Sequence, residues 1–91
     1  MFHVLITTYT QPLDVVDQTR PAHVAWLKDE VAAGRILLAG RQETPTGAVL
    51  ITGDISAEEA QGIIDRDPYT QAGLVTVERV PFNGSIRAEG L

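Results

Sequence analysis

Four short runs of apolar and β-branched side chains punctuate the chain, separated by polar and turn-forming segments. The first run, FHVLITTY, mixes β-branched and aromatic residues, which is typical of a strand. The last run, GLVTVERVPF, alternates apolar and polar positions and places Val75, Val77 and Pro81 on one face. The pattern therefore predicts four strands, at residues 2–9, 35–40, 48–54 and 73–82.

A helical spacing of apolar side chains follows the first run, in the segment PAHVAWLKDEVAA at residues 21–33. Pro21 is tolerated in the first turn of a helix, and Thr19 is a suitable cap before it. Gly34 supplies a left-handed stop. Residues 13–19 are ambiguous between a loop and a helical turn. The predicted inward stripe consists of His23, Leu27, Glu30 and Val31, with Ala22, Trp26 and Ala33 beside it.

A second helix is predicted from Ser56, because Glu59 three residues later completes a capping-box pattern. This helix is expected to end before Pro68, which cannot continue it. The order of elements is then β-α-β-β-α-β, the ferredoxin-like arrangement of the α+β class. It predicts a four-stranded antiparallel sheet with both helices on one face.

The strand at residues 35–40 is apolar throughout its ILLA stretch, and the next strand is nearly so. Such a pattern indicates that both faces of the sheet are covered. A single domain of residues 1–91 has no further element for the second face. The tail, residues 83–91, is polar and expected to be loose, apart from Ile86, which could dock elsewhere. We therefore expect a homodimer that pairs two sheets face to face.

Charge and composition narrow the functional classes. The formal net charge is −5, and the seven lysine and arginine residues are scattered instead of forming a basic patch with interleaved aromatics. Binding to nucleic acid or to an anionic membrane surface is therefore not expected. Without cysteine there is no disulfide, thiolate nucleophile or cysteine-based zinc site, which agrees with a cytoplasmic location. The N-terminal MFHVLITTYT lacks the features of a signal peptide or a membrane span.

Two residues stand out as candidates for chemistry. His23 lies on the inward stripe of the first helix, where an imidazole either fills space in the core or transfers protons. Asp67 precedes Pro68, and Asp-Pro is an ordinary helix end that needs no functional explanation. Tyr69 is open to the same two interpretations, as a core aromatic or as part of a site.

The chain resembles the YciI-related (YCII) domain family over nearly its full length. The resemblance is carried by FHVLI in the first strand, RPAHVAWL in the first helix, GRILLAG after it, and DPYTQAGLV with its closing PF. It implies a dimeric α+β barrel and a His–Asp dyad, which by position consists of His23 from RPAH and Asp67 from DPY. One activity known in the family is dehydrochlorination of a chlorinated hydroxyquinol. The wider superfamily includes muconolactone isomerases and small monooxygenases.

The chain departs from the family pattern around its second and third strands. Family members usually carry Gly-Pro after the second strand and Gly-Ser at the start of the third. Here the residues are Gly40-Arg41 and Gly47-Ala48. A substrate contact made by that serine is lost, and Arg41 adds a charge, so the substrate of a relative does not transfer.

The expected function is that of a small isomerase- or lyase-like enzyme acting on a cyclic or aromatic metabolite, with His23 as general acid/base and Asp67 as its orienting partner. This chemistry needs no cofactor, and the sequence shows no metal-binding spacing, activated nucleophile or glycine-rich phosphate loop. A cationic side chain could hold an anionic oxygen. The candidate substrate contacts are Arg20, Trp26, Arg41 and Tyr69.

Two other functions remain open at this point. A non-catalytic homodimer that binds a small molecule or a protein would tolerate a buried, inert His23. A cofactor-free monooxygenase is suggested by fold analogy alone.

Overall fold

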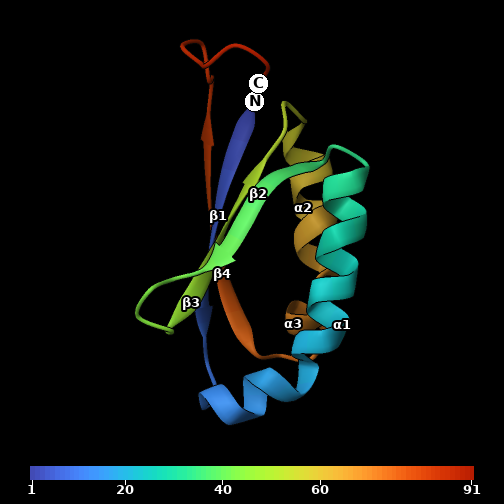
Figure 1. Cartoon of the computed structure of the whole chain (residues 1–91), viewed down its shortest axis with the longest axis vertical. Helices are drawn as coiled ribbons and strands as arrows, with labels where there is room; N and C mark the ends of the chain where they lie inside the picture. The colour runs from blue at the N-terminus through green and yellow to red at the C-terminus, as the bar shows by residue number, and fades with distance from the viewer.

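The four strands form one antiparallel sheet in the order β2-β3-β1-β4, and the helices cover one of its faces (Figure 1). This arrangement confirms the predicted ferredoxin-like α+β fold. The structure, a computed structural model, describes all 91 residues. None of its helices has the length and apolarity that a bilayer crossing requires. The elements are β1 (Phe2–Tyr9), α1 (Leu13–Ala32), β2 (Ile36–Arg41), β3 (Gly47–Thr52), α2 (Ala57–Arg66), α3 (Pro68–Gln71) and β4 (Val75–Phe82).

The first helix is longer than predicted. It begins at Leu13, so Thr19 is an interior residue and Pro21 lies inside the helix instead of in its first turn. Proline has no N–H for the bond to the carbonyl four residues earlier, and this weakens the helix locally. Figure 1 shows the early turns of α1 crossing the foot of the sheet before the helix turns along it. The early turns persist because Val16 is fully buried against Tyr69 and Leu74.

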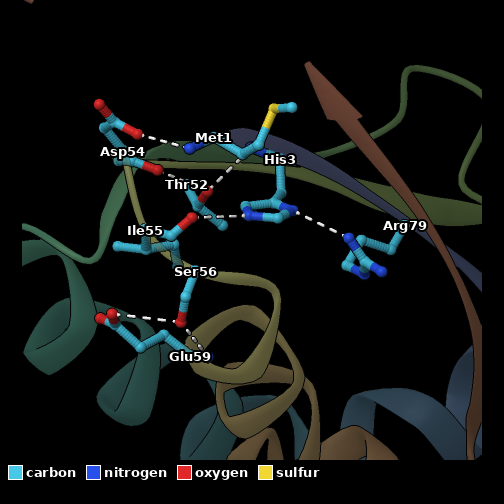
Figure 2. Close-up of polar contacts among 9 residues, drawn as sticks. Met1, His3, Thr52, Asp54, Ile55, Ser56, Glu59 and Arg79 are labelled. Atoms are coloured by element: carbon cyan, nitrogen blue, oxygen red, sulfur yellow. Dashed lines mark hydrogen bonds and ion pairs between the residues drawn. The ribbon is translucent and has the colours of Figure 1, made fainter. Parts of the chain in front are cut away.

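Apart from the start of α1, the helices begin and end where the sequence predicted. The Ser56 hydroxyl caps α2 by accepting a hydrogen bond from the Glu59 N–H at 3.0 Å (Figure 2). Gly34 adopts a left-handed φ of 76° just after α1. The second helix ends at Arg66, before Pro68, as expected. The single turn α3 that follows was not predicted.

The core lies between the helices and one face of the sheet. Val31, which was predicted to be on the inward stripe of α1, is 44% exposed. Seven residues make nearly two helical turns, so Glu30 lies directly above His23, whereas Val31 is rotated by a further ~100°. The fully buried apolar side chains of the larger core cluster are Leu5, Ile36, Ala48, Leu50 and Ile63.

The opposite face of the sheet carries no helix (Figure 1), and it is largely apolar, although Glu78 of β4 lies on it. The register of the strands places Val4 opposite Ile51 on this face. Leu38 is 58% exposed there, and Val80 and Phe82 are each 40% exposed. We call this surface the open face.

The tail, residues 83–91, contains no helix or strand. The guanidinium of Arg87 lies 4.8 Å from the ring centre of Phe2. Ile86 does not dock on the rest of the chain and is 97% exposed.

A buried carboxylate joins the two long helices and the start of β2. The Glu30 side chain is 3% exposed, and it accepts hydrogen bonds from Arg35 Nε at 2.5 Å and from Arg66 Nε at 3.0 Å. Burial by itself raises the pKa of Glu30, but the hydrogen bonds and charges of the two guanidinium groups more than offset this effect. The pKa of Glu30 is therefore lowered.

Replacing Glu30 with Gln is expected to lower the free energy of unfolding by about 1–3 kcal/mol at pH 7, because two charge-assisted hydrogen bonds are weakened. The half-exposed arginines keep this cost below that of a fully buried ion pair. The pKa of Glu30 is lower in the folded state than in the unfolded state, where it is about 4.3. Glu30 therefore stabilises the fold fully above the unfolded pKa, and this stabilisation is lost as the pH falls through the folded-state pKa. Urea unfolding of both proteins at pH 7 and pH 3 should show a smaller difference at pH 3. An equal difference at both pH values would contradict the assignment.

Candidate functional site

His23 and Asp67 form a direct, buried pair. The two residues are 44 positions apart in the sequence, yet His23 Nδ1 lies 2.8 Å from Asp67 Oδ1. Their exposed fractions are 7% and 2%. The contact joins the middle of α1 to the junction between α2 and α3.

The position of Asp67 follows from its neighbours in the sequence. Proline disfavours helical backbone in the residue before it, and Asp67 is extended, with φ −62° and ψ 122°. Its side chain then caps α3, because Oδ1 accepts a hydrogen bond from the Tyr69 N–H at 2.9 Å. The same oxygen faces His23 Nδ1. Asp67 therefore both marks the end of α2 and pairs with His23.

Two aromatic side chains contact the imidazole of His23. The ring of Tyr69 stacks on it with ring centres 3.9 Å apart and an interplanar angle of 9°. The ring of Trp26 lies 5.6 Å away at 43°. Stacking and the hydrogen bond to Asp67 together fix the orientation of the imidazole.

A comparison of the two histidines shows what distinguishes His23. His3 is buried as well, but both of its ring nitrogens are occupied (Figure 2). Its Nε2–H donates to the Ile55 carbonyl at 3.0 Å, and its Nδ1 accepts from Arg79 at 3.3 Å. In His23 only Nδ1 forms a hydrogen bond. Its Nε2 has no hydrogen-bond partner in the chain and is not fully covered by other atoms. Only His23 therefore has a nitrogen free for a ligand.

His23 lines a cavity of about 160 Å³ between α1, α3 and the helix-covered face of the sheet. The apolar part of the cavity wall includes Leu27, Ala39 and Leu50. Gly40, Arg41 and Ala48 also line it, so the positions where this chain departs from the usual family pattern lie at the cavity. The polar side chains that line it are Tyr9, Arg20, His23, Arg41 and Tyr69.

The structure brings three of the four candidate substrate contacts to the cavity. Arg20, Arg41 and Tyr69 line the cavity with His23. Trp26, the fourth candidate, is not among the lining residues and packs against the larger core cluster. Sequence analysis missed Tyr9, whose ring meets Tyr69 edge-on at 6.0 Å. The only sequence signal for Tyr9 is an aromatic residue at the end of the first strand.

Arg41 is fixed in place by two partners. Its Nε donates to the Tyr9 hydroxyl at 3.0 Å, and its Nη2 donates to Asp17 Oδ1 at 2.5 Å. These hydrogen bonds, the one to Asp17 first, raise the pKa of Arg41, so the guanidinium stays charged. Burial raises the pKa of Tyr69, and the nearby charge of Arg41 opposes this rise only in part. The Tyr69 phenol therefore stays protonated at neutral pH and is a neutral hydrogen-bond donor.

Comparison with known proteins agrees with this fold. The chain shares 79% identity over 24 residues with a "12 kDa protein" of Mycolicibacterium smegmatis, a match that covers 26% of this chain and all of that sequence. It is similar in structure to 5-chloro-2-hydroxyhydroquinone dehydrochlorinase (TftG) from Burkholderia phenoliruptrix AC1100, solved in complex with 2,5-dihydroxybenzoquinone. The TM-score is 0.77 at 24% identity, over 91% of this chain and 94% of that one, and this likeness shows the fold.

A family profile matches most of the chain directly. The YCII-related domain profile covers residues 1–83, which include every strand and helix, His23 and Asp67. The chain belongs to the YCII-related domain family.

Proposed function

We propose that this chain is a small enzyme that transfers a proton between His23 and a single-ring metabolite, in an isomerisation or an elimination. The observation that carries the proposal is the hydrogen bond between His23 Nδ1 and Asp67 Oδ1, with Nε2 free at a cavity. Titratable side chains that are held in a fixed orientation beside a cavity are typical of active sites. The similarity in fold to a dehydrochlorinase supports the same class of chemistry.

The geometry suggests how the proton moves. A carboxylate that accepts from Nδ1 places the proton of a neutral imidazole on that nitrogen and leaves the lone pair on Nε2. Nε2 then takes a proton from a C–H or O–H group of the substrate, and Asp67 stabilises the imidazolium that forms. In an isomerisation the imidazolium returns the proton to another substrate atom. In an elimination the electron pair of the broken C–H bond forms the new double bond, and the leaving group departs as an anion. Neither course requires a cofactor.

We further propose that the working form is a homodimer paired through the open face. Apolar side chains that are exposed to this extent on one sheet face typically mark an interface. A partner sheet would cover Leu38, Val80 and Phe82 together. We also propose a cytoplasmic location, with which a chain that forms no disulfide is compatible.

The tautomer of His23 is a direct test of the dyad. We expect ¹⁵N NMR of the ring nitrogens at neutral to alkaline pH to show Nδ1–H and an unprotonated Nε2 in His23, and the opposite tautomer in His3. In Asp67→Asn, the amide still has an oxygen that can cap α3, but it has lost the negative charge beside the imidazole. The resonances of His23 should therefore move, while those of His3 stay in place. An unchanged His23 would show that the two side chains are not coupled in solution.

Loss of the imidazole should abolish turnover without unfolding the protein. The assay is wash-in of deuterium from D₂O, or halide release, across a panel of single-ring lactones, phenols and halogenated hydroquinones. His23→Asn should lower the rate by about 10²- to 10⁴-fold, the usual contribution of a positioned acid/base group. Lys28→Gln, an exposed change on the same helix, is the matched control and should retain the rate. If no compound reacts, the result favours a binding module over an enzyme. If His23→Asn is as active as the control, His23 is not the acid/base group.

The dimer has its own test in sedimentation velocity at micromolar concentration. The wild type should sediment as a dimer, and Leu38→Glu should sediment as a monomer, because the substitution places a charge within an apolar interface. Ala25→Glu adds the same charge on the exposed side of α1 and should remain dimeric. A monomeric wild type would rule out pairing through the open face.

A further inference from the structure

The cavity at His23 has a charge opposite to that of the whole chain. The chain carries a formal net charge of −5, yet no aspartate or glutamate lines the cavity, and two arginines do. The carboxylates of Asp67 and Asp17 are bonded to His23 and Arg41 and do not line the cavity themselves. A pocket of this kind attracts anions, because field lines concentrate in a cleft with low-dielectric walls.

Arg41 has unused hydrogen-bonding capacity at this cavity. A guanidinium has five N–H groups in a fixed fork, and Tyr9 and Asp17 each engage one of them. The side chain is 23% exposed, and none of its nitrogens is among the covered, unpartnered atoms. Nη1, which neither partner engages, is therefore accessible to a ligand while the two partners hold the guanidinium in place.

A continuous row of aromatic side chains connects Arg41 with His23. The Tyr69 ring stacks on the imidazole at 3.9 Å and meets the Tyr9 ring edge-on at 6.0 Å. The Tyr9 hydroxyl accepts from Arg41 at 3.0 Å. The guanidinium and the imidazole thus lie at the two ends of a row of aromatic rings. Both side chains line the cavity, so a ligand bound there can contact both.

The volume of the cavity limits the ligand to about one ring. At about 160 Å³ it is close to an engineered cavity of about 150 Å³ that binds benzene. Combining size, charge and placement, and resting on the proposed function, we propose that Arg41 binds the carboxylate of a single-ring substrate and directs the ring toward His23. A carboxylate suits the site because the guanidinium fork matches its two oxygens and already pairs with one in Asp17.

Asp17 has a definite role in this arrangement. It pairs with Arg41 from the early turns of α1, and its own side chain is 41% exposed. A substrate carboxylate therefore meets a guanidinium that is partly neutralised by Asp17. Removing the charge of Asp17 strengthens binding of an anion at Arg41, whereas removing the charge of Arg41 weakens it.

The test is a titration of the full chain with benzoate and with its neutral isostere benzamide, followed by ¹H–¹⁵N NMR shifts at fixed ionic strength. Wild type should bind benzoate more tightly than benzamide. Arg41→Gln should weaken benzoate binding about tenfold or more and leave benzamide unchanged, because a hydrogen-bonded charge pair is lost. Asp17→Asn should strengthen benzoate binding about two- to fivefold, the range of a partly exposed ion pair. Arg87→Gln removes one positive charge in the tail and should change neither.

The opposite responses of the two variants separate a specific effect from unfolding, since a misfolded protein would not gain affinity. Equal binding of benzoate and benzamide, or benzoate binding that ignores Arg41→Gln, would overturn the proposal. So would a wild type that binds no benzoate. His23→Asn should still bind benzoate, so that loss of turnover in that variant reports on the dyad alone. Benzoate binding through Arg41 with no effect of His23→Asn on turnover would leave this inference intact and rule out proton transfer by His23.

Discussion

One carboxylate oxygen determines how the site is built. Asp67 Oδ1 accepts a hydrogen bond from the Tyr69 N–H and faces His23 Nδ1, at 2.9 Å and 2.8 Å, in a position where Asp67 is only 2% exposed. A buried carboxylate is costly unless it is hydrogen-bonded, so these two contacts together lower the cost of burying Asp67. The first bond starts α3, which carries Tyr69 onto the imidazole. The second ties α1 to that turn, so the backbone and the site depend on the same atom.

Much of this could be predicted from the sequence, for identifiable reasons. Strands with alternating side chains, the Ser56 cap and Pro68 as a helix stop depend on local preferences, and the structure agrees with each of them. The early turns of α1 could not be predicted, because Pro21 signals a helix start and only the burial of Val16 against α3 and its neighbours overrides this signal. Tyr9 and Asp17 were missed for a similar reason. Their importance comes from Arg41, which is distant in sequence and reaches them only after folding.

The two histidines mark the limit of sequence reasoning more clearly. His3 and His23 are both buried, and both contact polar groups far away in the sequence. Neither composition nor spacing shows that both ring nitrogens of His3 form hydrogen bonds within the fold, whereas one ring nitrogen of His23 has no partner. The resemblance of the chain to a known family, and not the local sequence pattern, selects His23. The structure supplies the physical difference, which is the accessible Nε2.

The site and the open face are coupled because side chains of β3 point alternately to the two faces of the sheet. Along β3, Ala48 and Leu50 line the cavity, whereas the next residue in each case, Val49 or Ile51, faces the other side of the sheet. A shift of one residue in the pairing with β1 would exchange the two sets. Two features oppose such a shift: a Cβ at Gly47 would collide with the Thr7 carbonyl, and the Thr7 hydroxyl bonds to both backbone groups of Ala48. The register that builds the cavity is therefore the same one that presents an apolar surface to a second subunit. A substitution that disturbed Gly47 would damage both at once.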